Sequence, residues 1–242
     1  MLKIGHRGAK AYAPENTLTS FRKAVDMGVD MVEVDVRLTK DGHLVAIHDN
    51  RLRRLTQEAG RVNKLTLAEL RKIKIFKHEP IPTLGEVLEV LDSKVCINIE
   101  LKVRKSAELV VQAIRDYGIR RDNILISSNY PSEIRVIERL EPEIRTALLF
   151  RAPTPLTPWL LADILAFILF PITKYYILWL VRHARADYLN INRWLLSKRK
   201  VQFLRKHGIR TCVWTVDNPK TIAYLKELQV DGIITNYPDR LL

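Results

Sequence analysis

The sequence is poor in cysteine: Cys96 and Cys212 are the only two, and each stands in an apolar stretch. So few cysteines at so wide a spacing exclude a disulfide-rich scaffold and a cysteine zinc site. The first residues also lack the charged and then apolar pattern of a secretory leader. We therefore expect two buried free thiols in a cytoplasmic protein.

Acidic residues are scarce in two further stretches. Residues 193–210 carry seven Lys or Arg and no acid, and residues 51–77 carry nine against Glu58 and Glu69. These stretches account for the whole formal net charge of +13. Solvated helix faces explain such runs, and so do an anionic membrane surface, a phosphate-bearing substrate or a nucleic acid. We expect no nucleic-acid partner, because no recognised nucleic-acid-binding module accompanies them.

What the sequence does contain is a regular alternation of strand-like and helix-like segments. Runs of β-branched residues recur between segments of helical period, several of which end at a glycine such as Gly28. Two T-x-x-E capping boxes mark further helix starts. This order predicts parallel strands in a doubly wound sheet or a (β/α)8 TIM barrel. A length of 242 residues suits a single barrel domain spanning residues 1–242.

Nine candidate strands occur where a barrel needs eight. The surplus is explained by Asp41-Gly42, a strong hairpin signal between the strands MVEVDVRL and LVAIH. A two- or four-residue loop would place His48 on the same face as Glu33 and Asp35, because directly opposed residues share a face. A three-residue loop would break this alignment.

Carboxylates occur at strand spacing in two of these segments. In VEVDV, Glu33 and Asp35 are two residues apart and point to one side of the sheet, and in INIELK Glu100 shares a side with Asn98 and Lys102. Acids at positions where apolar side chains would pack are costly unless they meet a cation or solvent. Three carboxylates suit one hard divalent ion, Mg²⁺ with Mn²⁺ or Ca²⁺ as alternatives.

Each of these features has a simpler explanation when taken alone. An E-x-D strand is often a solvent-facing edge, and a histidine at a strand end is often a satisfied polar residue. Four features nevertheless fall at or near the carboxyl ends of predicted strands: H-R at 6–7, E-x-D at 33–35, H-D at 48–49 and E-x-K at 100–102. Since α/β barrels assemble their active sites at these ends, the coincidence favours one shared site.

Five motifs carry a family resemblance: HRGAKAYAPENTLTSF, VEVDVRLTKDGHLVAIHD, INIELK, VWTVD and DGIITNYPD. In order and spacing they resemble the glycerophosphodiester phosphodiesterase family over nearly the whole chain. The resemblance implies a TIM barrel that hydrolyses glycerophosphodiesters to sn-glycerol 3-phosphate and an alcohol, through a cyclic phosphate. It also implies a divalent ion held by Glu33, Asp35 and Glu100, with His6 and His48 as the acid/base pair.

The residues fit this chemistry. A phosphodiester carries a negative charge that repels a nucleophile, and Arg7 and Lys102 would help the ion to neutralise that charge. Two histidines that titrate near neutrality can divide the proton transfers between them. Which of the two acts first is left open by the sequence.

Three further positions match the family motifs. We expect Glu15 to orient neighbouring site groups, with helix capping by Asn16 or Thr17 as the alternative use of this stretch. Trp214 either walls the glycerol pocket or belongs to the barrel core. At Asn236 the family commonly has Asp, so an acidic role behind the catalytic groups is in question there.

The segment 152–185 departs from the family because it is long and apolar. We expect two short helices, the first over 159–170, and no membrane span, since Asp163, Lys174 and Pro171 interrupt the stretch. This helical insertion should lie on the active-site side. It would form a lid or rest on an anionic membrane, admitting lysophospholipids in the manner of a lysophospholipase D. A dimer interface or a self-packed cap are the alternatives.

Two other functional classes compete with this hydrolase. The first is a catalytically idle barrel that binds lipid at a membrane surface, and a binding protein has no need of two histidines. The second is an inositol-phospholipid phospholipase C, which often uses a cation from the protein where this chain offers three carboxylates. We therefore expect an enzyme with a glycerophosphodiester substrate, cytoplasmic or peripheral at the membrane.

Overall fold

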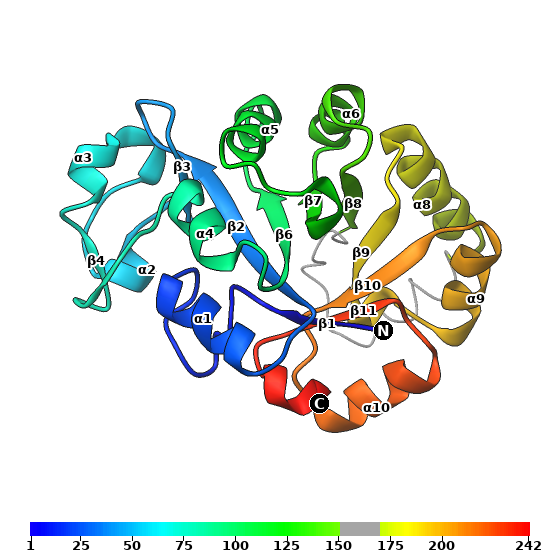
Figure 1. Cartoon of the computed structure of the whole chain (residues 1–242). Coiled ribbons are helices and arrows are strands. Elements are labelled where there is room, and N and C mark those ends of the chain that lie inside the picture. The colour runs from blue at the N-terminus through cyan, green and yellow to red at the C-terminus, as the bar shows by residue number, and fades with distance from the viewer. Residues whose placement is uncertain (151–169) are drawn as a thin grey trace.

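The computed structural model of the chain describes residues 1–150 and 170–242. Eight parallel strands form a closed barrel, because β1 pairs with both β2 and β11 (Figure 1). The chain is therefore an α/β TIM barrel, as predicted. The barrel strands are β1 (Leu2–Gly5), β2 (Met31–Leu38), β6 (Cys96–Leu101), β7 (Ile124–Ser128), β8 (Arg145–Phe150), β9 (Tyr188–Asn192), β10 (Arg210–Trp214) and β11 (Gly232–Thr235).

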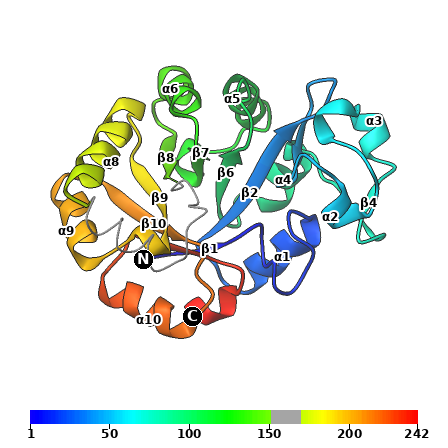
Figure 2. The ribbon, with the colours of Figure 1, turned by 180° about the vertical axis from the view of Figure 1, so that it is seen from behind.

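Helices surround the strands, and the view from behind shows the same ring (Figure 2). Their starts follow the predicted signals: the Thr17 side chain caps the first helix, and both T-x-x-E capping boxes form, at Thr66 and at Thr83. The helices of the ring are α1 (Leu18–Asp26), α4 (Leu84–Leu91), α5 (Ala107–Asp116), α6 (Pro131–Leu140), α8 (Phe170–Ala184), α9 (Lys198–Lys206) and α10 (Pro219–Glu227), with 3-10 turns η2 (Arg121–Asn123), η3 (Arg193–Leu195) and η4 (Pro238–Leu241).

Strand alternation divides the side chains between two cores. On β2, the buried Val32, Val34 and Val36 face outward and pack in one cluster with residues of α1, α4 and α5. The barrel interior holds a separate apolar cluster that includes Met31 and Cys212. The residues between the outward valines, Glu33 and Asp35, therefore face the barrel interior. Both cysteines are free thiols, as expected, although Cys96 is only partly buried.

The surplus strand is the predicted hairpin partner, and its loop has the length that breaks the alignment of His48 with Glu33 and Asp35. Strand β3 (Leu44–Ala46) pairs antiparallel with β2, with Leu38 opposite Leu44. The Thr39 amide donates to the His43 carbonyl, which leaves a three-residue loop, and Gly42 takes the positive φ of 83° that such loops require. His48 is therefore out of phase with the inward face of β2, and it reaches the site from beyond the end of β3.

A small excursion between β3 and α4 was not predicted from the sequence. It lies to one side of the barrel, beside α1 and α4 (Figures 1 and 2). Its own apolar cluster, which includes Leu52, Leu55 and Val62, holds it together. The excursion contains α2 (Arg53–Thr56), η1 (Val62–Lys64), α3 (Leu67–Leu70) and the two-stranded sheet of β4 (Lys74–Ile75) and β5 (Glu79–Pro80).

Part of the predicted insertion is a barrel helix. Residues 170–184 form α8, which buries Ile177 and Val181 in a cluster that also contains residues of β9 and α9. The rest of the predicted insertion, including nearly all of the helix expected over 159–170, lies outside the described residues. Among the residues that the structure describes, no helix has the length and apolar character needed to cross a membrane.

Candidate active site

The site residues predicted from the sequence converge at one end of the barrel. Most of them lie near or just beyond the carboxyl end of a strand, where barrels of this kind carry their loops, while Glu33 lies further back on its strand and Glu15 lies on a loop. They are His6 and Arg7 after β1, Glu33 and Asp35 on β2, His48 after β3, Glu100 and Lys102 at the end of β6, Trp214 at the end of β10, Asn236 after β11, and Glu15 on the loop before α1.

Three carboxylates form the centre of this site. One oxygen from each of Glu33, Asp35 and Glu100 lies within 4.8 Å of the others. The carboxylates are close together because β2 and β6 are neighbouring strands, on which Asp35 lies directly opposite Glu100. Glu33 and Asp35 are 2% and 1% exposed. Within the described residues, Glu33 Oε1 and Asp35 Oδ1 accept no hydrogen bond, which is unusual for buried oxygens and leaves them available as ligands.

Two cations face the carboxylates. Arg7 Nε lies 3.1 Å from Asp35 Oδ2, and Lys102 Nζ lies 2.6 Å from Glu100 Oε1 and 3.4 Å from Asp35 Oδ1. Arg7 adopts a positive φ of 54°, and its backbone N–H donates to Glu33 Oε2 at 2.7 Å. This backbone conformation costs about 1 kcal/mol or more in a residue with a side chain, and here it directs an amide at a carboxylate.

The electrostatics of the cluster favour an added cation. Burial and the charge of Asp35 raise the pKa of Glu33 well above its ordinary value, and burial also raises the pKa of Glu100. Burial opposes ionisation of Asp35 as well, but Lys102 and Arg7 outweigh it and lower the pKa to about 2. When all three acids are ionised, they outnumber the two cations that face them, and oxygen donors at this spacing fit a hard divalent ion.

His6 has a fixed tautomer. Asn236 Nδ2 donates to Asp217 Oδ2 at 2.7 Å, so the amide oxygen of Asn236 faces His6 and accepts from its Nδ1 at 2.7 Å. The other oxygen of Asp217, Oδ1, accepts from the backbone N–H of Asn236 and from the Thr235 hydroxyl. With Nδ1 protonated, the lone pair of a neutral His6 is on Nε2. Burial and the neighbouring Arg7 lower the pKa of His6 to about 4, so the ring is neutral at pH 7.

His48 is held by an acidic partner. Its Nδ1 lies 2.6 Å from Asp49 Oδ1, so the proton is on Nδ1 and Nε2 is left for other groups. Arg54 Nε donates to the second oxygen of Asp49 at 2.5 Å. Burial lowers the pKa of His48, while Asp35 acts in the opposite direction. Both histidines therefore present Nε2, each oriented by a side chain on its Nδ1.

Glu15 binds three cations. Its carboxylate contacts Arg7 NH1 at 2.7 Å, Lys10 Nζ at 3.0 Å and Arg54 NH2 at 2.6 Å. These cations hold the pKa of Glu15 well below its usual range despite its burial. The cap of α1 is Thr17. Asn16 instead bonds to Asp35: its Nδ2 donates to Asp35 Oδ2, and its Oδ1 accepts from the Asp35 backbone N–H.

Trp214 packs against the interior apolar cluster of the barrel. It is partly exposed, and its indole Nε1 is buried without a hydrogen-bond partner among the described residues. A buried indole N–H normally finds an acceptor, so this group is available to a polar atom of a ligand. Trp214 can therefore belong to the barrel core and still form a wall of a glycerol pocket.

Two residues that support the histidines were missed by sequence reasoning. Asp217 is the last letter of the VWTVD motif, and its place at a strand end was the only signal for it. Arg54 stands in the basic stretch, where no periodicity separates it from its neighbours. It joins Glu15 to Asp49 because the excursion folds back over the barrel end.

Comparisons with known proteins point to a single family. The model of the glycerophosphoryl diester phosphodiesterase family matches residues 6–240. YhdW of Bacillus subtilis is 37% identical, with 100% of this chain and 97% of YhdW covered. A glycerophosphodiester phosphodiesterase of Caldanaerobacter subterraneus is 34% identical, with 100% of this chain and 96% of that protein covered.

A solved structure with a similar fold is that of an Oleispira antarctica phosphodiesterase in complex with its product sn-glycerol-3-phosphate. It has a TM-score of 0.82 and 26% identity, and the match covers 98% of this chain and 94% of that chain.

Proposed function

Because the chain belongs to the glycerophosphoryl diester phosphodiesterase family, and is therefore a hydrolase of glycerophosphodiesters, we propose that it releases sn-glycerol 3-phosphate and an alcohol by metal-dependent two-histidine catalysis. The observation that carries the mechanism is the cluster of Glu33, Asp35 and Glu100, flanked by two histidines that both present Nε2.

Glu33, Asp35 and Glu100 would hold the divalent ion, for which Mg²⁺ is our first choice. The buried Glu33 Oε1, which accepts no hydrogen bond among the described residues, and the hard oxygen donors of all three side chains support this assignment. When bound, such an ion neutralises charge on the nonbridging phosphate oxygens and on the transition state. Arg7 and Lys102 border the same cluster and would bind the phosphate from its other sides.

The two histidines would divide the proton transfers. One Nε2 accepts the proton of a glycerol hydroxyl as its oxygen attacks phosphorus, and the other Nε2 protonates the departing alcohol. The resulting cyclic phosphate is opened by water, with the two roles exchanged. Trp214, with its unpartnered indole N–H, would form one wall of the glycerol pocket. His6, neutral at pH 7, suits the role of the base. His48 would act as the acid in its doubly protonated form, which Asp49 on Nδ1 stabilises and in which Nε2 carries the proton that is donated.

Product identity tests the proposal. The enzyme, given glycerophosphocholine and a divalent ion, is expected to produce sn-glycerol 3-phosphate and choline in equal amounts, read by phosphorus NMR and by a choline assay. Glycerol with phosphocholine would mean cleavage of the other ester bond and would contradict the proposal.

The charge on the partner of His6 offers a pH test. Exchanging the two residues in Asn236→Asp/Asp217→Asn keeps a donor–acceptor pair between them but places the carboxylate against His6. A carboxylate favours the protonated ring, so the pKa of His6 should rise from about 4 by roughly one unit or more. As the pH falls, Nε2 of His6 then becomes protonated at a higher pH than in the wild type, and the ring can no longer act as a base. The acid limb of the kcat/KM profile should therefore move to higher pH.

Asp217→Asn alone serves as the control for this exchange. It removes the same negative charge from position 217 without placing a charge on the His6 partner. The acid limb should then stay in place or move to lower pH. An unchanged limb in the exchange variant would show that His6 does not set it.

An exposed aromatic face on α8 supports chain-bearing substrates presented at a membrane. Tyr176 stacks on Trp179 with centroids 6.1 Å apart, and Trp179 stacks on His183 at 5.0 Å. Tyr176 and Trp179 are 52% and 55% exposed. Residues 170–210 carry ten Lys or Arg and one acid, Asp187. Aromatic rings among cations fit an anionic lipid surface, which would deliver lysophospholipids to the site.

Vesicle binding tests this extension. Tyr176→Ala/Trp179→Ala is expected to weaken binding to phosphatidylglycerol-containing vesicles about tenfold or more, because two large rings lose their interfacial contact. Tyr117→Ala/Tyr224→Ala removes rings that are also exposed, on other sides of the barrel. Equal binding by both variants would contradict the membrane assignment and leave the hydrolysis of small diesters untouched.

A further inference from the structure

A basic cavity adjoins the candidate active site. It has a volume of about 730 Å³ and is formed where the excursion begins. It shares one wall with the site, because Asp49, the partner of His48, also lines the cavity. Its lining residues are Asp49, Asn50, Arg51, Arg53, Arg54 and Arg61.

The cavity carries positive charge that the protein does not neutralise. The single acid in its lining, Asp49, is already bound to His48 and Arg54. Within residues 1–150 and 170–242, the side chains of Arg51, Arg53 and Arg61 form no hydrogen bond or ion pair. Guanidinium groups that line one concavity repel each other, and an anion that enters it removes that repulsion. Guanidinium groups also match phosphate oxygens in pairs, which selects phosphate over a point anion.

Backbone hydrogen bonds and buried apolar side chains hold the segments that carry these arginines. Arg51 and Arg61 face each other in an antiparallel bridge, and the Leu52 amide donates to the Gly60 carbonyl at 3.2 Å. Asn50 receives the Val62 amide at its carbonyl. The side chains of Leu52 and Val62 are buried in the cluster of the excursion. Binding an anion here therefore orders only side chains, which limits its entropic cost.

We propose that this cavity binds a phosphate monoester on the alcohol portion of the substrate, so that the enzyme prefers glycerophosphodiesters whose alcohol carries a second phosphate. The proposal rests on the proposed function, since the glycerol 3-phosphate half is common to all such substrates and carries no further anionic group. Only the alcohol can supply one. A cationic alcohol such as choline meets repulsion from Arg51, Arg53 and Arg61, which are unpaired among the described residues.

Two substrates that differ by one phosphate test the proposal. Glycerophosphoglycerol is compared with the same diester bearing a phosphate monoester on the terminal hydroxyl of its alcohol. The wild type is expected to show a kcat/KM about tenfold higher for the phosphorylated diester. The variant Arg51→Gln/Arg53→Gln/Arg61→Gln should lose that preference and keep its activity on glycerophosphoglycerol within about twofold. An equal kcat/KM for both diesters in the wild type would overturn the proposal.

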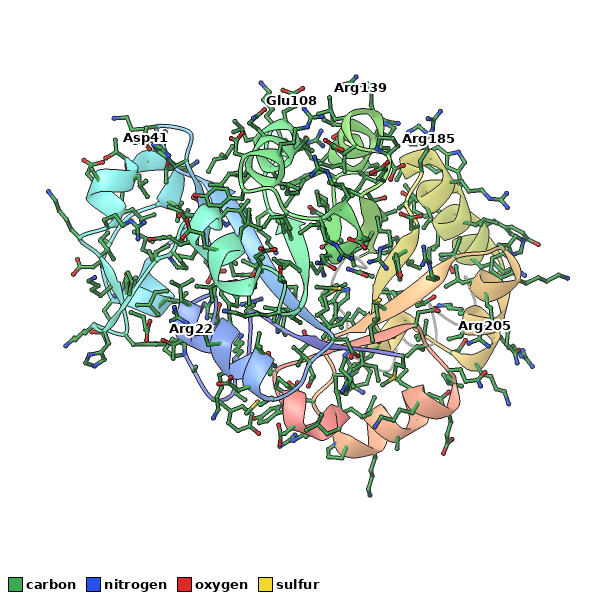
Figure 3. All side chains as sticks on the ribbon, in the orientation of Figure 1. Arg22, Asp41, Glu108, Arg139, Arg185 and Arg205 are labelled. Carbon is green, nitrogen blue, oxygen red and sulfur yellow. The ribbon has the colours of Figure 1, made fainter. Side chains whose placement is uncertain are left out.

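A matched variant separates local binding from long-range attraction. Arg139→Gln/Lys206→Gln/Lys220→Gln removes the same three charges from exposed positions outside the cavity lining, and Arg139 lies on the outer helices (Figure 3). It should retain the preference of the wild type. An equal loss in this variant would assign the preference to net charge alone and overturn the cavity site.

A binding measurement keeps this inference separate from the proposed function. If neither diester is hydrolysed, the proposed function fails, and calorimetry with glycerol 1,3-bisphosphate in EDTA still tests the cavity. Binding to the wild type that the cavity variant weakens about tenfold supports the anion site. Binding of equal strength to both proteins, or to neither, overturns it.

Discussion

Replacing either histidine is expected to reduce kcat by about 100- to 10,000-fold, the usual contribution of a positioned acid or base. His6→Ala removes a ring whose Nε2 is free because Asn236 accepts from Nδ1, and His48→Ala removes the ring held by Asp49. KM should change little, because neither ring carries the charge that binds the phosphate. Steady-state assays on glycerophosphocholine give both constants.

The pattern among the histidine variants is as informative as the size of the effect. His6→Ala/His48→Ala should be little slower than the worse single variant, since two groups that act in one step are not additive. His43→Ala, at an exposed histidine on the hairpin loop, should remain within about twofold of the wild type. A loss below about tenfold for either His6 or His48 would remove that residue from the acid/base pair.

The second large effect concerns the carboxylates. Glu33→Gln and Glu100→Gln each remove one oxygen charge from the cluster while keeping the size of the side chain. Each should lower kcat/KM by about 1,000-fold or more at a fixed metal concentration, through weaker metal binding and lost charge complementarity. Calorimetric titration with Mg²⁺ or Mn²⁺ should show the weaker affinity directly.

Stability measurements distinguish a metal ligand from a structural acid. With ligand at about 100 times its dissociation constant, the wild type should gain about 2.7 kcal/mol in its free energy of unfolding, seen as a rise in Tm. Glu33→Gln should lose this gain but should not be less stable than the wild type in EDTA, since it relieves repulsion from Asp35. Glu108→Gln, at an exposed acid on α5, is the control (Figure 3). A large loss of stability in EDTA would identify Glu33 as structural.

The acidic centre could be predicted from the sequence because strand period alone determines which residues share a face. Glu33 and Asp35 alternate with outward valines, and Glu100 follows the same rule on the neighbouring strand. The parallel strands could also be predicted, because strand-like and helix-like segments alternate along the chain. Short-range patterns of this kind survive folding unchanged.

Features that depend on loop geometry or on distant segments could not be predicted in this way. The hairpin register could not be chosen from the sequence because Gly42 also permits a three-residue loop, which shifts every later residue by one position relative to a two- or four-residue loop. The contacts of Arg54 and Asp217 arise from the fold of the excursion and of the last strand. The apolar residues of α8 suggested an insertion, although a barrel helix needs the same apolar face to cover β9.

Metal removal and return test the central claim most directly. The rate of sn-glycerol 3-phosphate release from glycerophosphocholine is measured in the purified enzyme, after treatment with EDTA, and after addition of Mg²⁺, Mn²⁺ or Ca²⁺. The cluster of Glu33, Asp35 and Glu100 predicts that EDTA abolishes release and that at least one of the three ions restores it in the wild type but not in Glu33→Gln. Full activity in EDTA would contradict metal-dependent catalysis at this site.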